Sequence, residues 1–130
     1  MPDDEFVSTV ADVLENELLA RAFMSAFNTR SIDQIAPFLS ADVAYQPRTC
    51  ECVRGRDAVL AVFSGLFENI TVFEFLPEVV AVSGTSVLAE QRVRVQFPGE
   101  ATHELFGLAT FTVGDGFVRS WRQLHAQPVE

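Results

Sequence analysis

Apolar residues recur with a helical period in the first half of the chain and alternate with polar residues in the second half. From about 6 to 28 they return every three or four positions, which predicts one long amphipathic helix or two abutting ones. Ser31 and Gln34 have the spacing of a capping box and predict a short helix that ends near residue 39. A short strand is expected over 42–46 and a third helix over about 56–67.

The second half of the chain predicts a run of long strands, because its apolar residues alternate and turn-forming pairs or triplets that contain glycine separate the segments. The expected strands lie near 71–81, 85–97, 102–113 and 117–126. Pro77 cannot donate to a strand ladder, so we expect a bulge or a sheet edge there. Helices followed by an antiparallel meander favour an α+β fold with helices on one face of the sheet.

Length and composition fit one folded domain over residues 1–130, since 48% of the residues are hydrophobic. The net charge is −9, and all nine basic residues are arginine. An acidic chain lacks the basic surface that nucleic acids and anionic membranes require, so neither is an expected partner. No apolar run approaches the roughly 20 residues that span a bilayer. The N-terminus is acidic where a secretory signal would be basic, which favours a cytoplasmic location.

Cysteines and histidines do not form a metal-binding pattern in this sequence. Cys50 and Cys52 are a lone pair, and His103 and His125 lie far along the chain. A structural zinc site needs four ligands at suitable spacing. We therefore expect two reduced thiols in or beside a loop, with no metal and no cofactor.

The strand expected over 85–97 has two different faces, because alternate residues point to opposite sides of a sheet. One row is mostly apolar and the other is charged. The first row is Val87, Ala89, Gln91, Val93, Val95 and Phe97, and the second is Leu88, Glu90, Arg92, Arg94 and Gln96. We expect the charged row to line a cavity under the helices, and a second subunit to cover the apolar row in a homodimer through the outer sheet face.

Several segments resemble the limonene-1,2-epoxide hydrolase family, which lies in the nuclear transport factor 2-like superfamily with polyketide cyclases of the SnoaL type and ketosteroid isomerase. The segments are 42–46, 55–59, 65–67, 90–93 and 120–122, and the resemblance runs from about 18 to 126. It implies a cone-shaped domain in which a strongly curved antiparallel or mixed sheet packs against three to four helices. It also implies a deep apolar pocket and a dimer.

The resemblance matches only two of the five catalytic positions of that family, whose Asp–Arg–Asp group works with a Tyr and an Asn. Tyr45 matches the Tyr and Arg92 the Arg, whereas Pro47 takes the Asn position and Arg94 and Gln123 take the Asp positions. Arginine and glutamine do not serve as acid or base at working pH. Hydrolysis of epoxides by the family mechanism is therefore not expected.

The candidate site follows from this matching and from strand parity, which places three rows of side chains around the expected cavity. The catalytic candidates are Arg92, Tyr45, Glu90 and His125, and the ligand-binding candidates are Arg94, Gln123, His103, Trp121, Leu105 and Gly107. Alternatives stay open at this point. Glu90 could form a structural ion pair with either arginine, Tyr45 and Trp121 could be core aromatics, and His103 could lie at the rim.

These residues indicate a small-molecule pocket protein whose ligand has an apolar body and an anionic or enolisable head. If it is an enzyme, we expect an isomerase, cyclase or lyase that needs no cofactor. An epoxide hydrolase with a rearranged base and a non-catalytic, dimerising binding domain are the alternatives. The sequence decides neither whether the pocket is catalytic nor which ligand it takes.

Overall fold

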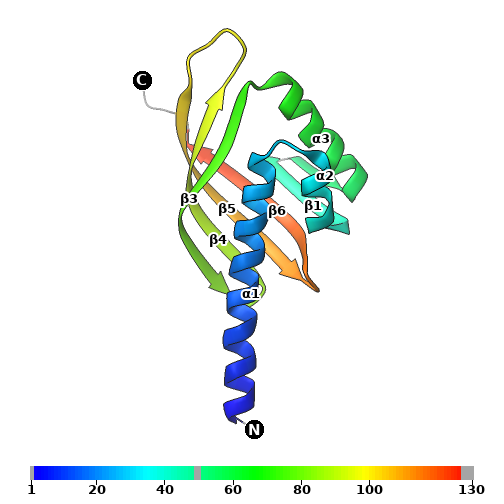
Figure 1. The fold of residues 1–130 in the computed structure, drawn as a ribbon, viewed down its shortest axis with the longest axis vertical. Helices are drawn as coiled ribbons and strands as arrows, with labels where there is room; N and C mark the ends of the chain where they lie inside the picture. The colour runs from blue at the N-terminus through cyan, green and yellow to red at the C-terminus, as the bar shows by residue number, and fades with distance from the viewer. Residues whose placement is uncertain (1, 49–50, 127–130) are drawn as a thin grey trace.

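The computed structural model describes residues 2–48 and 51–126, and the side chains of residues 9–47 and 51–125 (Figure 1). Helices come first and most of the strands second, as the sequence predicts. The elements are α1 (Pro2–Asn28), α2 (Ile32–Ile35), a 3₁₀ turn η1 (Ala36–Phe38), β1 (Leu39–Arg48), β2 (Glu51–Arg54), α3 (Arg56–Asn69), β3 (Val72–Ser83), β4 (Ser86–Gln96), β5 (His103–Gly114) and β6 (Phe117–Ala126). The short strand β2 was expected to be loop.

The six strands form one mixed sheet in the order β2-β1-β6-β5-β4-β3. Strands β3 to β6 are an antiparallel meander, while β1 pairs parallel to β6 and antiparallel to β2. The sheet curls around the helices (Figure 1), which confirms the predicted α+β class with a curved mixed sheet and three helices. The bulge expected at Pro77 is also present, since the register between β3 and β4 shifts between Pro77 and Val79.

Helix α1 packs on the concave face of the sheet with only its second half. Phe23 and Phe27 are fully buried, and their rings lie 5.1 and 5.3 Å from the ring of Trp121. The first half of the helix extends past the sheet (Figure 1), and Val10 and Leu14 in this half are exposed. The apolar stripe predicted for this helix is therefore covered by the sheet over about half of its length.

Arg30, directly after α1, fixes the position of α3. Its guanidinium donates to the carbonyl oxygens of Phe67 and Ile70, where α3 ends, and lies 5.2 Å from the centre of the Phe67 ring. A helix end leaves carbonyl groups without intrahelical partners, and a cation there satisfies them and interacts favourably with the helix dipole. This contact holds α3 beside the sheet, on the side where the cleft opens.

The two faces of β4 are the reverse of the expected arrangement. The apolar row that includes Val87, Val93 and Val95 is buried beneath the helices, and Glu90, Arg92 and Arg94 are exposed on the outer face. The helices need an apolar surface to pack on, and burying unpaired charges costs far more than leaving them in water. The predicted subunit contact through Val87, Val93 and Val95 is therefore wrong, because these residues form the core of one chain.

Candidate functional site

A cleft of about 980 Å³ lies between α3 and the concave face of the sheet. Apolar side chains form most of its walls, which suits a small, largely apolar ligand. They include Val62 and Leu66 on α3, Phe73 on β3, Val93 and Val95 on β4, and Leu105 on β5.

Six of the described lining side chains are polar, and three of these are not exposed. Gln123 and His125 lie two residues apart on β6, and Tyr45 lies on the neighbouring strand β1, where it pairs in register with Trp121. Residues two apart on a strand share a face and are about 7 Å apart. The prediction that Trp121, Gln123 and His125 point the same way is confirmed, and the last two face the cleft together.

Gln91 on β4 forms a hydrogen bond with Gln123 and is not itself among the residues that line the cleft. Its Nε2 donates to Gln123 Oε1 at 3.3 Å, and both side chains are buried, with exposed fractions of 0% and 5%. Gln91 Oε1 and Gln123 Nε2 have no hydrogen-bond partner among the described residues. Gln91 was not among the residues expected in the site, although a glutamine inside the apolar row of β4 was a signal for it.

Because Gly107 has no side chain, the His125 ring can pack directly beside it. The two residues are direct partners across β5 and β6, and a Cβ atom at Gly107 would lie 3.1 Å from His125 Nδ1 and 3.2 Å from Val93 Cγ2. His125 Nδ1 is buried there without a partner among the described residues. Gly107 therefore belongs to the support of the site rather than to the cleft lining.

Burial keeps the side chains of Tyr45 and His125 in their neutral forms. It lowers the pKa of His125 below the ordinary value of 6.5, because the charged imidazolium loses solvation. Desolvation also raises the pKa of the Tyr45 phenol well above its ordinary value. Near neutral pH the cleft therefore presents a neutral imidazole, a phenol and an amide.

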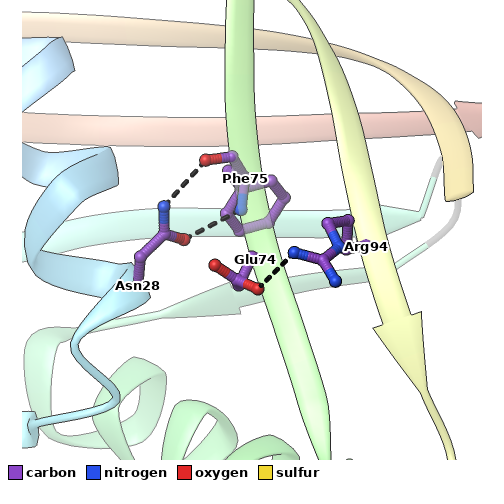
Figure 2. Close-up of polar contacts among 4 residues, drawn as sticks. All are labelled: Asn28, Glu74, Phe75 and Arg94. Atoms are coloured by element: carbon purple, nitrogen blue, oxygen red, sulfur yellow. Dashed lines mark hydrogen bonds and ion pairs between the residues drawn. The ribbon is translucent and has the colours of Figure 1, made fainter. Parts of the chain in front are cut away.

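The two arginines that were expected in the cavity lie on the opposite side of the sheet. Arg94 Nη1 is 3.4 Å from Glu74 Oε1 on the outer face (Figure 2), and Arg92 lies 2.9 Å from Glu78 and 3.6 Å from Glu104. Glu90 is exposed on the same face. The placement of Arg92, Arg94 and Glu90 in the cavity is wrong, because a shift of one residue in matching a strand exchanges its two faces.

The other candidates divide between the rim and the core. His103 is exposed at the mouth of the cleft, as the rim alternative has it, together with Glu51 and Glu100. Leu105 lines the wall. Trp121 is 1% exposed and its ring contacts six other aromatic rings, so it belongs to the core and not to the cleft lining.

The described part of the chain contains no group of three or more His, Cys, Asp or Glu side chains that could hold a metal ion. Cys52 is a free, exposed thiol on β2, and Cys50 lies outside the described residues. Within the same ranges, no helix is both long enough and apolar enough to cross a bilayer.

Residues 20–121 match the model of the SnoaL-like domain. Solved structures with this fold include an epoxide hydrolase from M. tuberculosis of the limonene-epoxide-hydrolase-like type, with a TM-score of 0.79 at 20% identity over 88% of this chain and 84% of that one. A candidate polyketide cyclase from Xanthomonas campestris pv. campestris gives 0.78 at 24% identity over 86% and 90%. A candidate ketosteroid isomerase from Kribbella flavida gives 0.74 at 23% over 92% and 83%.

At these identities the likeness establishes the fold and leaves the chemistry open. A comparison with curated proteins finds no match.

Proposed function

This chain belongs to the family of SnoaL-like domains, and on that premise we propose that its cleft binds a small, largely apolar molecule through a neutral carbonyl head. The observation that carries this proposal is the pair Gln123 and His125. Both present polar groups in an otherwise apolar cleft, and Gln123 Nε2 has no hydrogen-bond partner among the described residues. A buried polar group without a partner costs free energy that a bound ligand can recover.

The charge distribution favours a neutral head over an anionic one. The described floor of the cleft carries no arginine, and Glu51 and Glu100 lie at its mouth. A carboxylate ligand would lose its solvation and gain no cation in return. This replaces the expectation of an anionic head, which depended on Arg92 and Arg94 being in the cavity.

His125 is the group that we propose to move a proton. A neutral imidazole accepts a proton from the carbon next to a ligand carbonyl, and the electron pair of that C–H bond moves to form an enolate. The amide of Gln123 donates to the enolate oxygen, and return of the proton to another atom of the ligand completes an isomerisation. In a cyclase the enolate carbon attacks a second carbonyl instead.

Epoxide hydrolysis is less well supported than carbonyl chemistry. It requires a group that deprotonates water and a group that protonates the epoxide oxygen. The carboxylates described around the cleft, Glu51 and Glu100, lie at its mouth, away from the polar floor. The likeness to an epoxide hydrolase is at the level of the fold.

Deuterium exchange tests the proposal without knowledge of the natural substrate. Naphthyl methyl ketone in deuterated buffer should exchange its methyl protons faster with the protein than with the same concentration of imidazole, as followed by proton NMR. His125→Gln should slow the catalysed exchange by about 100-fold, the lower end of what a positioned base contributes. The control Gln34→Met changes an exposed residue of α2 and should leave the rate unchanged. Catalysed exchange that survives His125→Gln would contradict the assignment of the base.

We also propose a homodimer through the outer face of the sheet, with different residues from those first expected. Exposed apolar side chains lie on three adjacent strands of this face, and Glu90 and Arg92 of β4 lie between those of β3 and β5. These side chains are Leu76, Val79, Leu88, Phe106 and Leu108. An exposed patch of this kind on three neighbouring strands is typical of an interaction surface.

Sedimentation velocity tests this association. Leu108→Glu should convert a dimer into a monomer, because it would place a charge within the buried contact. The matched control is Leu18→Glu, at an exposed leucine of α1 away from the sheet. A wild-type protein that sediments as a monomer at micromolar concentration would contradict the dimer.

A further inference from the structure

The hydrogen bond between Gln91 and Gln123 determines which half of the Gln123 amide is left without a partner. Gln91 Nε2 donates a hydrogen bond to Gln123 Oε1 at 3.3 Å. A primary amide has its acceptor on one side and its donors on the other. With the oxygen held by Gln91, the NH₂ group of Gln123 is left buried and without a hydrogen-bond partner among the described residues, so it is the half of the amide that a ligand would have to satisfy.

Burial holds this orientation in place. Gln123 is 5% exposed and Gln91 is fully buried, so neither amide is free to exchange its partner for bulk water. If the Gln123 amide alone turned over, two NH₂ groups would face each other and the hydrogen bond would be lost, whereas a turn of both amides would keep the bond and reverse its direction. In a poorly solvated site that loss costs on the order of 1 kcal/mol or more.

The small residues of β5 make the contact possible. Gln91 lies on β4 and Gln123 on β6, so their side chains meet above the intervening strand. The β5 residues paired with them are Gly107, opposite Gln91, and Ala109, opposite Gln123. Larger side chains at these two positions would separate the amides.

From this geometry we propose that Gln91 is a positioning residue, which turns the donor of Gln123 toward the cleft and so makes the site select ligands whose head accepts a hydrogen bond. The inference deepens the proposed function and rests on it. The ligand class it names is a ketone, aldehyde or related carbonyl compound with an apolar body. A ligand of the same shape without an acceptor should bind more weakly.

Two ligands of matched shape test the selection. Naphthyl methyl ketone and isopropenylnaphthalene differ in that a carbonyl oxygen replaces a CH₂ group. Each is titrated into the full-length protein and followed by the NMR shifts of cleft residues such as Leu105. Wild type should prefer the ketone by roughly fivefold to tenfold, the range of one neutral hydrogen bond. Gln123→Met, which removes the donor, should abolish this preference.

The role of Gln91 is tested by its own variant and by the double variant. Gln91→Met keeps the length of the side chain but frees the Gln123 amide, so the preference for the ketone should fall to about twofold or less while the hydrocarbon binds as before. In the Gln123→Met background, Gln91→Met should change the preference no further. Gln34→Met, a control of identical chemistry on exposed α2, should keep the wild-type preference.

Each outcome supports one step or overturns it. If wild type binds neither ligand in the cleft, the proposed function fails and this inference with it. If wild type binds both equally, or prefers the hydrocarbon, the cleft is a binding site but the donor assignment is wrong. If Gln123→Met abolishes the preference and Gln91→Met does not, or if Gln91→Met lowers the affinity for both ligands equally, Gln91 has no positioning role.

Discussion

Asn28 closes the free edge of β3 through two hydrogen bonds to the backbone of Phe75. Its Nδ2 donates to the Phe75 carbonyl at 2.7 Å, and its Oδ1 accepts from the Phe75 N–H at 2.8 Å (Figure 2). Strand β3 is at one edge of the sheet, so these backbone groups have no neighbouring strand on that side. The side chain at the end of α1 thus pairs with the edge as another strand would, and it ties the helix to the wall of the cleft.

Asn28→Ala should lower the free energy of unfolding by about 2–3 kcal/mol, because both hydrogen bonds are lost and a partly buried N–H is left without a partner. Urea denaturation measures this change. Asn69→Ala is the matched control, since the Asn69 side chain donates to the carbonyl of Gly65 at an exposed position of α3. That variant should cost less than about 0.5 kcal/mol. Equal losses in the two variants would contradict the role given to Asn28.

Arg94→Ala should leave ligand binding in the cleft unchanged. Arg94 and Glu74 form an exposed ion pair on the outer face (Figure 2), and such pairs contribute about 0–1 kcal/mol to stability. The affinity for naphthyl methyl ketone and the urea midpoint should therefore both stay close to wild type. A tenfold loss of affinity would show that Arg94 reaches the ligand and that the assignment of the two sheet faces is wrong.

The alternation of residues in β4 defined two rows, but it did not say which row faces the helices. The charged row was placed inside because a second subunit could cover an apolar outer row, and the match of Arg92 to a family arginine agreed with that choice. The physical signal favoured the other row, because Val87, Val93 and Val95 can pack against Phe23 and Phe27, whereas buried arginines need partners. The strand itself and its turns followed from local sequence, while the direction of its faces depended on tertiary packing.

Other parts of the site were accessible from the sequence because they depend on parity alone. Gln123 and His125 share a face on any strand that contains both, and Tyr45 lies in a segment that alternates. The contact between Gln91 and Gln123 was not accessible, because it joins strands that are separated by β5. The small strand β2 was missed for a related reason, since four residues that follow a polar loop carry too short an alternation to predict it.

Gly107→Ala should weaken ketone binding and slow the deuterium exchange. The added methyl would lie 3.1 Å from His125 Nδ1, so the imidazole must move by a few tenths of an ångström. We expect a cost in stability of about 1–2 kcal/mol from overpacking. In Gly65→Ala, on α3, the new methyl meets nothing within 4 Å, and a better helix former should stabilise the protein by up to about 1 kcal/mol. Wild-type affinity and exchange in Gly107→Ala would mean that the position of His125 is not critical.

The free energy of unfolding should depend on pH through His125. Burial lowers the pKa of His125 in the folded state below 6.5, so the unfolded chain takes up the proton first. Stability is therefore lost as the pH falls from 6.5 toward the lowered folded pKa, and it is unaffected by this group at higher pH. His125→Gln should remove this part of the dependence. Parallel curves of unfolding free energy against pH for wild type and His125→Gln would contradict the role given to His125.

The central claim is that a carbonyl ligand binds between Gln123 and His125, and a crystal structure of the protein with naphthyl methyl ketone tests it most directly. The account predicts the naphthyl ring against Val62, Leu66 and Phe73, with the carbonyl oxygen about 3 Å from Gln123 Nε2 and the methyl carbon facing the His125 ring. A ketone whose oxygen points to the mouth of the cleft, or one that lies on the outer face beside Arg92 and Arg94, would contradict the account.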